Sequence, residues 1–246
     1  MNRFLHLIRG DVKQIARDPM LAFYLLAPML IILAVRFGIP FVAALLQREA
    51  GFDLAPYYNL ILSFAMLLIP LILGVLAGFM MLDERDENLI AYYSVTPLSK
   101  SGYLLYRLSF PIVLSVLYCG MFLLAASLAP AQTASLLATL PMLAMEAPLI
   151  ALLLAACASN KVEGLAWSKG AGLIVFLPAI AYFVPLPWQL LAGIVPAYWV
   201  PRTFLASGMT PEALTIPVLA LCGVTGIAVH VIALRFLYQR FLLKTD

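Results

Sequence analysis

The sequence predicts an all-α integral membrane protein with six transmembrane helices. Three observations support this prediction: the chain is 64% hydrophobic and only 11% charged, its apolar residues gather in long stretches, and its basic residues fall on one side of the resulting layout. A soluble domain is about half apolar and about a quarter charged, so water is the wrong solvent for most of this chain. The net charge of +3 is too small to indicate nucleic-acid binding.

A helix needs ~20 largely apolar residues to cross the hydrocarbon core of a bilayer. Stretches that meet this requirement follow one another through a single transmembrane domain, residues 1–246. The predicted spans are Met20 to Leu46, Tyr57 to Leu82, Tyr103 to Leu128, Ser135 to Ala158, Lys169 to Val184 and Leu214 to Tyr238. The fifth is short.

Residues 1–18 predict an amphipathic interfacial helix ahead of the first span. Leu5, Ile8, Val12 and Ile15 recur at spacings of three and four, so they share one face of a helix. Basic residues lie away from that face. Such a helix either rests in the headgroup layer against anionic lipid or packs on another protein surface.

The basic residues predict which side faces the cytoplasm. Twelve fall on the side of the N-terminus and only two, Arg48 and Arg202, on the other. Loops rich in lysine and arginine stay in the cytoplasm, so both termini are expected there, in a multi-pass protein of the plasma (inner) membrane. The twelve are Arg3, Arg9, Lys13, Arg17, Arg85, Lys100, Arg107, Lys161, Lys169, Arg235, Arg240 and Lys244.

An external segment, residues 185–213, precedes the last span and predicts a re-entrant or surface-lying helix pair. Its apolar part is too short to cross, is bracketed by prolines, and carries Trp188, Tyr198 and Trp199. Such aromatic residues settle at the membrane boundary. A plain interfacial loop is the alternative.

Two charged residues, Arg36 and Glu146, fall inside predicted spans, where a charge costs about 2.5–3.5 kcal/mol on insertion scales. Both lie about 15 Å below the outer surface at ~1.5 Å per residue, so they could pair. Alternatively, each meets a backbone group, a kink or a water-filled cavity separately. His230 is interpreted as a packing histidine, and Gly74 and Gly78 form a GxxxG pattern that is also frequent by chance.

Several catalytic patterns are absent from the sequence. It contains no GxxxxGK[ST] phosphate loop, no HExxH and no GxSxG. Cys119, Cys157 and Cys222 sit singly inside apolar runs, which disfavours a disulfide framework or a zinc site. We therefore expect no catalytic, cofactor or metal site on this chain.

A charged island, residues 82–107, separates the second and third spans. It begins Leu-Asp-Glu-Arg-Asp-Glu, continues through an amphipathic piece containing Leu89, Tyr92 and Tyr93, and reaches the turn Thr96-Pro97-Leu98-Ser99. Together with Arg17-Asp18-Pro19, the run from Gly78 to Glu84 and the six-span layout, this order of short motifs resembles the membrane subunit of ABC-2 type transporters. The likeness covers essentially the whole chain and extends to drug-export permeases, including fluoroquinolone exporters.

The resemblance implies that residues 83–101 form a cytoplasmic coupling loop whose helix docks on a separate ATPase subunit. Carried onto this sequence, the docking positions are Asp83, Glu84, Arg85, Glu87, Leu89, Tyr92, Tyr93, Thr96, Pro97, Leu98 and Ser99. ATP and Mg²⁺ would then bind the partner ATPase. A solvated loop without a partner is the other interpretation of the acidic run.

The resemblance also implies a second permease subunit, identical or related, with the first and fifth spans near the seam between them. That seam would bring in Met29, Ile32, Phe37, Phe176 and Tyr182, an apolar path for a hydrophobic or amphiphilic substrate. Two other functions stay open: a membrane-embedded lipid-modifying enzyme, and a membrane assembly or immunity factor that moves nothing.

Overall fold

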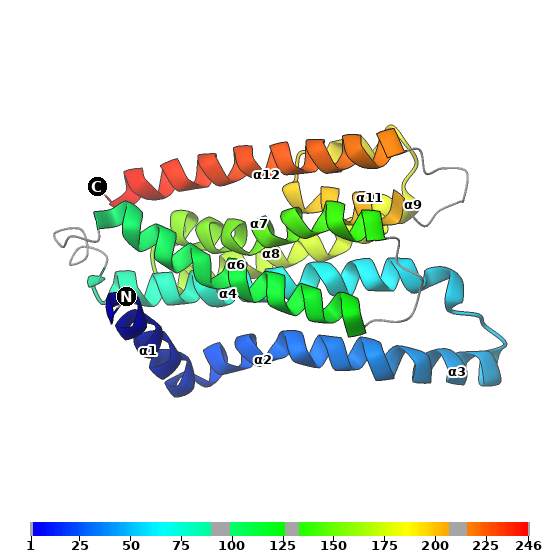
Figure 1. The fold of residues 1–246 in the computed structure, drawn as a ribbon, viewed down its shortest axis with the longest axis horizontal. Helices are drawn as coiled ribbons and strands as arrows, with labels where there is room; N and C mark the ends of the chain where they lie inside the picture. Colours follow the sequence, from blue (N-terminus) through cyan, green and yellow to red (C-terminus); the bar gives the residue numbers. More distant parts are fainter. Residues whose placement is uncertain (1, 90–98, 126–132, 207–215, 246) are drawn as a thin grey trace.

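The protein is a bundle of long helices in the computed structural model, which describes residues 2–89, 99–125, 133–206 and 216–245. All regular structure in these ranges is helical (Figure 1). The elements are α1 (Asn2–Arg17), α2 (Pro19–Leu33), the π-helix η1 (Ala34–Gly38), α3 (Ile39–Ala50), η2 (Ala55–Tyr57), α4 (Tyr58–Asp86), α6 (Ser99–Ala125), α7 (Thr133–Cys157), α8 (Lys161–Ala171), η3 (Gly172–Phe176), α9 (Leu177–Phe183), α10 (Gln189–Ala192), η4 (Pro196–Tyr198), α11 (Trp199–Ala206) and α12 (Ile216–Thr245).

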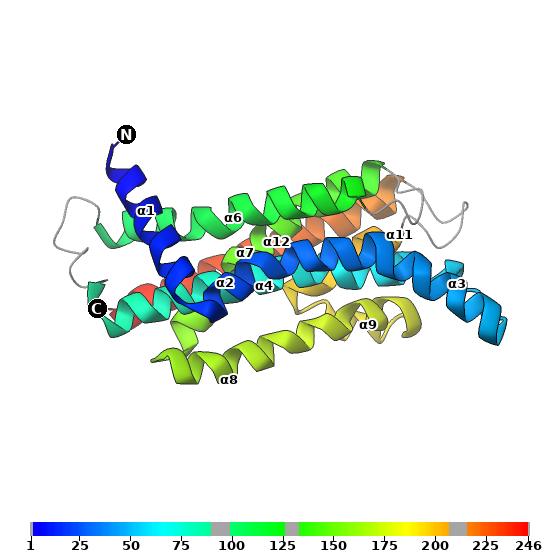
Figure 2. The same ribbon diagram turned by 90° about the horizontal axis from the view of Figure 1, so that it is seen from below.

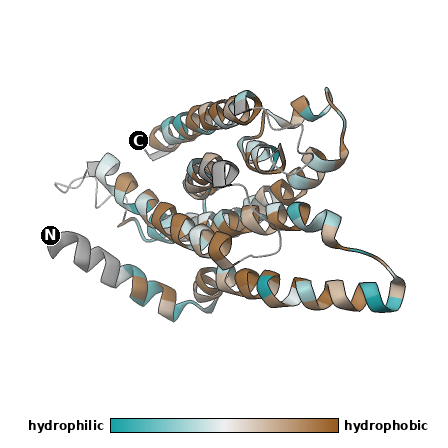
Figure 3. Ribbon diagram, turned by 45° about the vertical axis from the view of Figure 1, so that its right-hand side comes forward, coloured by the Kyte–Doolittle hydropathy of each residue, from teal (hydrophilic) through white to brown (hydrophobic). Residues whose placement is uncertain are grey.

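Within the described residues, six helical runs are long and apolar enough to cross a membrane. This confirms the predicted number of spans. Figure 3 shows hydrophobic residues along most of each long helix, with a hydrophilic turn at the far end of α3. The runs are Pro19–Ala50, Ala55–Asp86, Ser101–Ala125, Ala138–Cys157, Lys161–Phe183 and Pro217–Leu243.

Helices α4 and α7 form the centre of the bundle. An added Cβ at Gly74 would lie 2.5 Å from the carbonyl oxygen of Ala147, and one at Gly78 would lie 2.9 Å from Cβ of Leu154. The two glycines therefore let the backbone of α4 lie directly against the backbone and the Cβ atoms of α7. Small residues permit this close packing of helices in membranes. The GxxxG pattern in the second span is thus a packing motif. Helix α4 is enclosed on nearly all sides, and its residues 64–82 are apolar around the whole circumference, as expected for a helix buried in a bundle.

The outer helices each expose an apolar face. Phe41 on α3, Leu105 on α6, Phe176 on η3 and Val224 on α12 are 71%, 75%, 61% and 68% exposed. Exposed apolar surface on this scale suits contact with lipid rather than water.

Proline explains two irregular turns in the outer spans. The ring of Pro40 leaves no room for a regular helix at the carbonyl of residue 36, four positions earlier, and the chain widens there into η1. In the fifth span the tighter turn η3 likewise precedes Pro178.

The helices place the chain segments at two ends of the bundle as the predicted topology requires. Figures 1 and 2 show both termini, the end of α4, and the starts of α6 and α8 at one end. The far end of α3 and the starts of α4 and α12 lie at the other. We name the first the terminal end. Its cytoplasmic orientation stays a prediction based on the basic residues.

The fifth span begins earlier than predicted. Residues 161–168 were expected to belong to a cytoplasmic loop, but α8 starts at Lys161. Asn160 caps it, accepting a hydrogen bond from the backbone N–H of Glu163 at 2.9 Å, while the Glu163 carboxylate accepts one from the N–H of Ser159 at 2.7 Å. This reciprocal capping stabilises a helix start ahead of the apolar run.

The predicted external re-entrant segment forms short helices up to Ala206. Gln189 is buried, accepts a hydrogen bond from the Tyr198 hydroxyl at 2.9 Å and donates one to the Ala181 carbonyl at 3.2 Å. Helix α11 packs against α4, α7 and α12. The segment is thus packed onto the bundle, and its depth in the membrane stays a prediction.

Candidate functional site: a charged cavity at the terminal end

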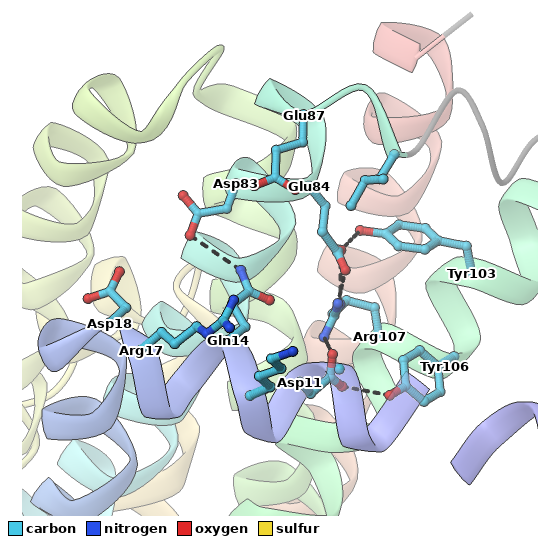
Figure 4. Close-up of a pocket in the computed structure, with 13 residues that line it drawn as sticks. Asp11, Gln14, Arg17, Asp18, Asp83, Glu84, Glu87, Tyr103, Tyr106 and Arg107 are labelled. Carbon is cyan, nitrogen blue, oxygen red and sulfur yellow. Dashed lines mark hydrogen bonds and ion pairs between the residues drawn. The ribbon is translucent and has the colours of Figure 1, made fainter. Parts of the chain in front are cut away.

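A cavity of about 630 Å³ lies between α1, the end of α4 and the start of α6. Figure 4 shows that acidic and basic side chains from all three helices meet around it. Its lining consists of Gly10, Asp11, Lys13, Gln14, Arg17, Asp18, Asp83, Glu84, Glu87, Leu89, Tyr103, Tyr106 and Arg107.

Arg107 joins the three helices. Its Nη1 donates to Oδ1 of Asp11 on α1 at 3.0 Å, and its Nε donates to Oε2 of Glu84 on α4 at 3.1 Å. Nη2 makes a second bond to Glu84, through Oε1. The guanidinium therefore holds Glu84 by two parallel bonds, the strongest arrangement for an arginine and a carboxylate.

Two tyrosines complete this cluster. The Tyr103 hydroxyl donates to Oε2 of Glu84 at 2.5 Å, and the Tyr106 hydroxyl donates to Oδ2 of Asp11 at 2.6 Å. Tyr103, Tyr106 and Arg107 share one face of α6 because they are spaced by three and four residues. All five side chains are buried. Each carboxylate has Arg107 and a tyrosine hydroxyl as partners in place of water, and Arg107 has the two carboxylates.

Lys161 makes a second connection, between α8, α4 and the junction of α1 with α2. Its Nζ lies 3.0 Å from Oδ2 of Asp18 and 3.0 Å from Oδ2 of Asp83. Gln14 on α1 also donates to Asp83, at 3.5 Å.

Asp18 has two roles in this connection. Besides binding Lys161, it caps α2, accepting hydrogen bonds from the N–H groups of Met20 at 2.8 Å and Leu21 at 3.3 Å. The hydrogen bond from Lys161 is the main cause that lowers the pKa of the Asp18 carboxyl, with the two backbone donors adding to it and burial opposing them.

Arg85 links α4 to the C-terminus of α7. It donates to the carbonyl oxygens of Ala155 at 2.6 Å and Ala158 at 2.8 Å, and lies 5.5 Å from the ring centre of Phe241 on α12. The last carbonyls of a helix have no intrahelical partner and carry partial negative charge, so a cation suits this place.

The predicted ATPase-docking residues thus divide into groups. Asp83, Glu84 and Arg85 bind other helices of the same chain. Glu84 is only 7% exposed, and the guanidinium of Arg85 is bound by carbonyl oxygens at the end of α7. Glu87 is exposed and Leu89 half-buried, and both line the cavity. Tyr92, Tyr93, Thr96, Pro97 and Leu98 lie outside the described residues, and Ser99 begins α6.

Sequence reasoning missed Asp11, Tyr103, Tyr106 and Arg107 as members of this site. One signal was available: Asp11 lies three residues after Ile8 and four before Ile15, on the face predicted to be apolar. In the structure Asp11 and Ile15 are buried whereas Val12 is 62% exposed, so the buried face of α1 is centred on Asp11. An acid on a buried face indicates a partner.

The two intramembrane charges do not pair with each other. Glu146 on α7 binds His230 on α12 at 2.9 Å, and Arg36 is exposed and donates to the carbonyl of Ala125 at 3.2 Å. The pairing hypothesis is therefore wrong, because equal depth did not determine which way each side chain points. His230 is the partner that it overlooked.

The five residues of the predicted substrate path do not form one surface. Met29, Phe37 and Phe176 are exposed, but Ile32 is 5% exposed and belongs to the core. Tyr182 is half-buried beside Tyr57, with ring centres 6.3 Å apart. Helices α2 and α9 each pack against α4 (Figure 2), so a path along them would need a second subunit.

Comparison with known proteins agrees with this architecture. The family model described as "Fluoroquinolones export permease protein Rv2686c-like" matches residues 11–238. Two curated relatives, the fluoroquinolones export permease proteins Rv2686c and MT2760 of two Mycobacterium tuberculosis strains, are each 32% identical over 199 residues, which cover 80% of this chain and 79% of theirs. No solved structure matches the chain.

The matched region runs from Asp11 in the charged cluster to Tyr238 near the end of α12, so it includes all of the cavity lining except Gly10, the first five spans and most of the sixth. It also agrees with the resemblance to ABC-2 type drug-export permeases. This multi-pass helical membrane protein belongs to the Rv2686c-like family of fluoroquinolones export permeases.

Proposed function

We propose that this chain is the membrane subunit of an ATP-driven exporter and that a separate ABC ATPase drives it from the terminal end. ATP and Mg²⁺ would bind that partner, since this sequence carries no phosphate-loop motif. The names of the curated relatives make a hydrophobic or amphiphilic drug of the fluoroquinolone class the proposed cargo.

One observation carries the mechanical part of the proposal. The helices on either side of residues 87–98, α4 and α6, are joined at that place by the Glu84–Arg107 pair, and α1 is joined to them through Asp11. A force applied to the intervening segment would therefore reach three helices together. Without such connections the ATP-driven movement would be absorbed by bending at the helix ends.

The docking surface is proposed to lie beyond this cluster rather than within it. Glu87 is exposed next to the cavity, whereas Glu84 is occupied by Arg107 and Tyr103. Glu87, Leu89 and the predicted residues from Tyr92 to Ser99 are therefore the proposed contacts with the ATPase, and Asp83, Glu84 and Arg85 transmit the movement to the bundle.

A second permease subunit, identical or related, is part of the proposal. Helices α2 and α3 leave a long apolar face exposed, including Phe37 and Phe41. The cargo path would form where this face meets the second subunit.

The experiment is transport by the purified chain, reconstituted with and without a candidate ABC ATPase. Inverted vesicles should accumulate a fluorescent fluoroquinolone only with both proteins and ATP. A partner ATPase whose phosphate-loop lysine is replaced serves as the control and should abolish uptake. Full transport without any ATPase, or a lipid-modifying activity that needs none, would contradict the proposal.

A further inference from the structure

A second groove, of about 540 Å³, lies on the opposite side of α6 from the charged cavity. It runs between α6, α7 and α12, and nearly all of its wall is apolar. Its lining consists of Ser101, Leu104, Leu105, Leu108, Ser109, Ile112, Met145, Pro148, Leu152, Leu234, Arg235 and Tyr238. The charged cavity shares none of these residues.

The groove is polar at one end only. Ser101 lies in the first turn of α6, and the Tyr238 hydroxyl donates to its Oγ at 3.4 Å, which sets these two residues and Arg235 at the terminal end. Ile112 and Met145 line the groove farther from the terminal end, Ile112 about three turns along α6 from Ser101. At ~1.5 Å per residue, Ser101 to Ile112 spans about 16 Å, close to half of a hydrocarbon core of about 30 Å. The groove is therefore about as long as one leaflet of the hydrocarbon core is thick.

Arg235 has an exposed side chain, and none of the acidic residues in the described ranges forms an ion pair with it. Two less exposed arginines at the terminal end, Arg107 and Arg85, are bound within the chain instead. Arg107 is paired with two carboxylates, and Arg85 is bound by two carbonyls. An unpaired guanidinium above an apolar groove is a place for an external anion.

We propose that this groove binds an anionic phospholipid of the leaflet at the terminal end. Its phosphate would meet Arg235 and the hydroxyls of Tyr238 and Ser101, and one acyl chain would lie against Leu105, Leu108 and Ile112. The match is one of charge and of length: basic pockets between transmembrane helices bind anionic headgroups, and the groove continues inward for the depth of one leaflet. The site is separate from the proposed ATPase contact and does not depend on it.

The test is lipid retention by the full-length, delipidated protein, titrated with phosphatidylglycerol or phosphatidylcholine of the same acyl chains and followed by native mass spectrometry. The wild type should bind phosphatidylglycerol more tightly than phosphatidylcholine by about fivefold, the value of one basic residue near an anionic headgroup. Arg235→Gln should remove the preference.

Arg240→Gln is the matched control, because Arg240 is exposed on the same helix but lies outside the groove. It should keep the preference for phosphatidylglycerol. A second variant, Leu105→Trp, adds bulk at a residue that is 75% exposed, so folding should tolerate it. It should weaken the binding of phosphatidylglycerol and phosphatidylcholine to the same extent.

Three results would overturn the proposal. Equal effects of the two arginine variants would place the binding elsewhere or make it non-specific. A fluoroquinolone that displaces the lipid from wild type but not from Leu105→Trp would make the groove a drug site. Dimers that dissociate in Arg235→Gln would make it an interface between copies of this chain.

Discussion

Oε2 of Glu146 and Nε2 of His230 lie 2.9 Å apart in the middle of the bundle, and both side chains are almost completely buried. The other ring nitrogen of His230 lies 2.7 Å from the carbonyl of Gly226. A carbonyl only accepts, so Nδ1 carries a proton, and the hydrogen bond between Nε2 and Oε2 needs one further proton on one of these two atoms. The pair carries no net charge whether this proton is on Nε2 or on the Glu146 carboxyl. Burying it inside the membrane therefore costs less free energy than burying an unpaired charge.

This arrangement predicts different effects for two substitutions of Glu146. Glu146→Gln keeps a donor for Nε2 and should leave the thermal unfolding midpoint in detergent nearly unchanged. Glu146→Ala leaves a buried ring nitrogen unsatisfied and should destabilise by about 1–3 kcal/mol. Replacing both Glu146 and His230 by leucine should recover much of the lost stability. Equal destabilisation by Glu146→Gln and Glu146→Ala would contradict a hydrogen bond between Glu146 and His230.

Gly74→Ala should destabilise the bundle, since its new Cβ would lie 2.5 Å from the Ala147 carbonyl oxygen, an atom that cannot rotate away. Overpacking of this kind costs about 1–3 kcal/mol. Gly120→Ala on α6 is the matched control, because a Cβ there meets no atom within 4 Å. Chemical unfolding should give a lower free energy of unfolding for Gly74→Ala than for Gly120→Ala. If Gly74→Ala were as stable as the wild type, α4 and α7 would pack less closely than in this structure.

Two nearby acids of the charged cavity, Glu84 and Glu87, should differ in what they contribute: Glu84 to the stability of the bundle and Glu87 to binding of the ATPase. Glu84→Gln weakens a buried ion pair and should lower the unfolding midpoint; breaking such a pair costs about 3–5 kcal/mol at most. Glu87→Ala changes an exposed side chain and should reduce ATPase co-purification with little change in stability. If Glu84→Gln instead lowered ATPase binding at unchanged stability, Glu84 would be a direct contact.

Acid should weaken the connection between Asp18 and Lys161. The pKa of Asp18 is lowered in the folded protein below the ordinary value of an aspartate. Its contribution to stability is therefore present above that ordinary value and is lost as the pH falls through the lower folded pKa. Asp18→Asn should therefore be less stable than the wild type at pH 7, and the difference should shrink below about pH 4. Unfolding midpoints measured from pH 7 to 3 check this. Glu49→Gln, a change to a surface pair with Arg48, should show no such trend.

The sequence predicted the six spans well because a bilayer imposes a simple requirement on length and apolarity. The boundaries were less accurate where local hydrogen bonding decides them. Lys161 was placed in the loop before the fifth span. In the structure the Asn160 and Glu163 caps begin a helix there, and Asp18 and Asp83 form ion pairs with Lys161. For Arg36 and Glu146, depth was estimated from residue number, but rotation about each helix axis was unknown.

The charged cluster around Arg107 shows the same limit. Asp11, Glu84 and Arg107 come from three helices, and nothing in their spacing along the chain relates one to another. Only Asp11, an acid on an otherwise apolar face, carried a local signal.

The sequence by itself determined that this protein is helical, crosses a membrane six times and has one strongly basic side, because hydrophobic length and charge distribution are properties of the chain taken segment by segment. Only the tertiary structure decided which polar groups are partners. Pairing depends on how each helix is rotated and packed, as the close α4–α7 contact at Gly74 and Gly78 and the 3.0 Å distance between Arg107 and Asp11 illustrate.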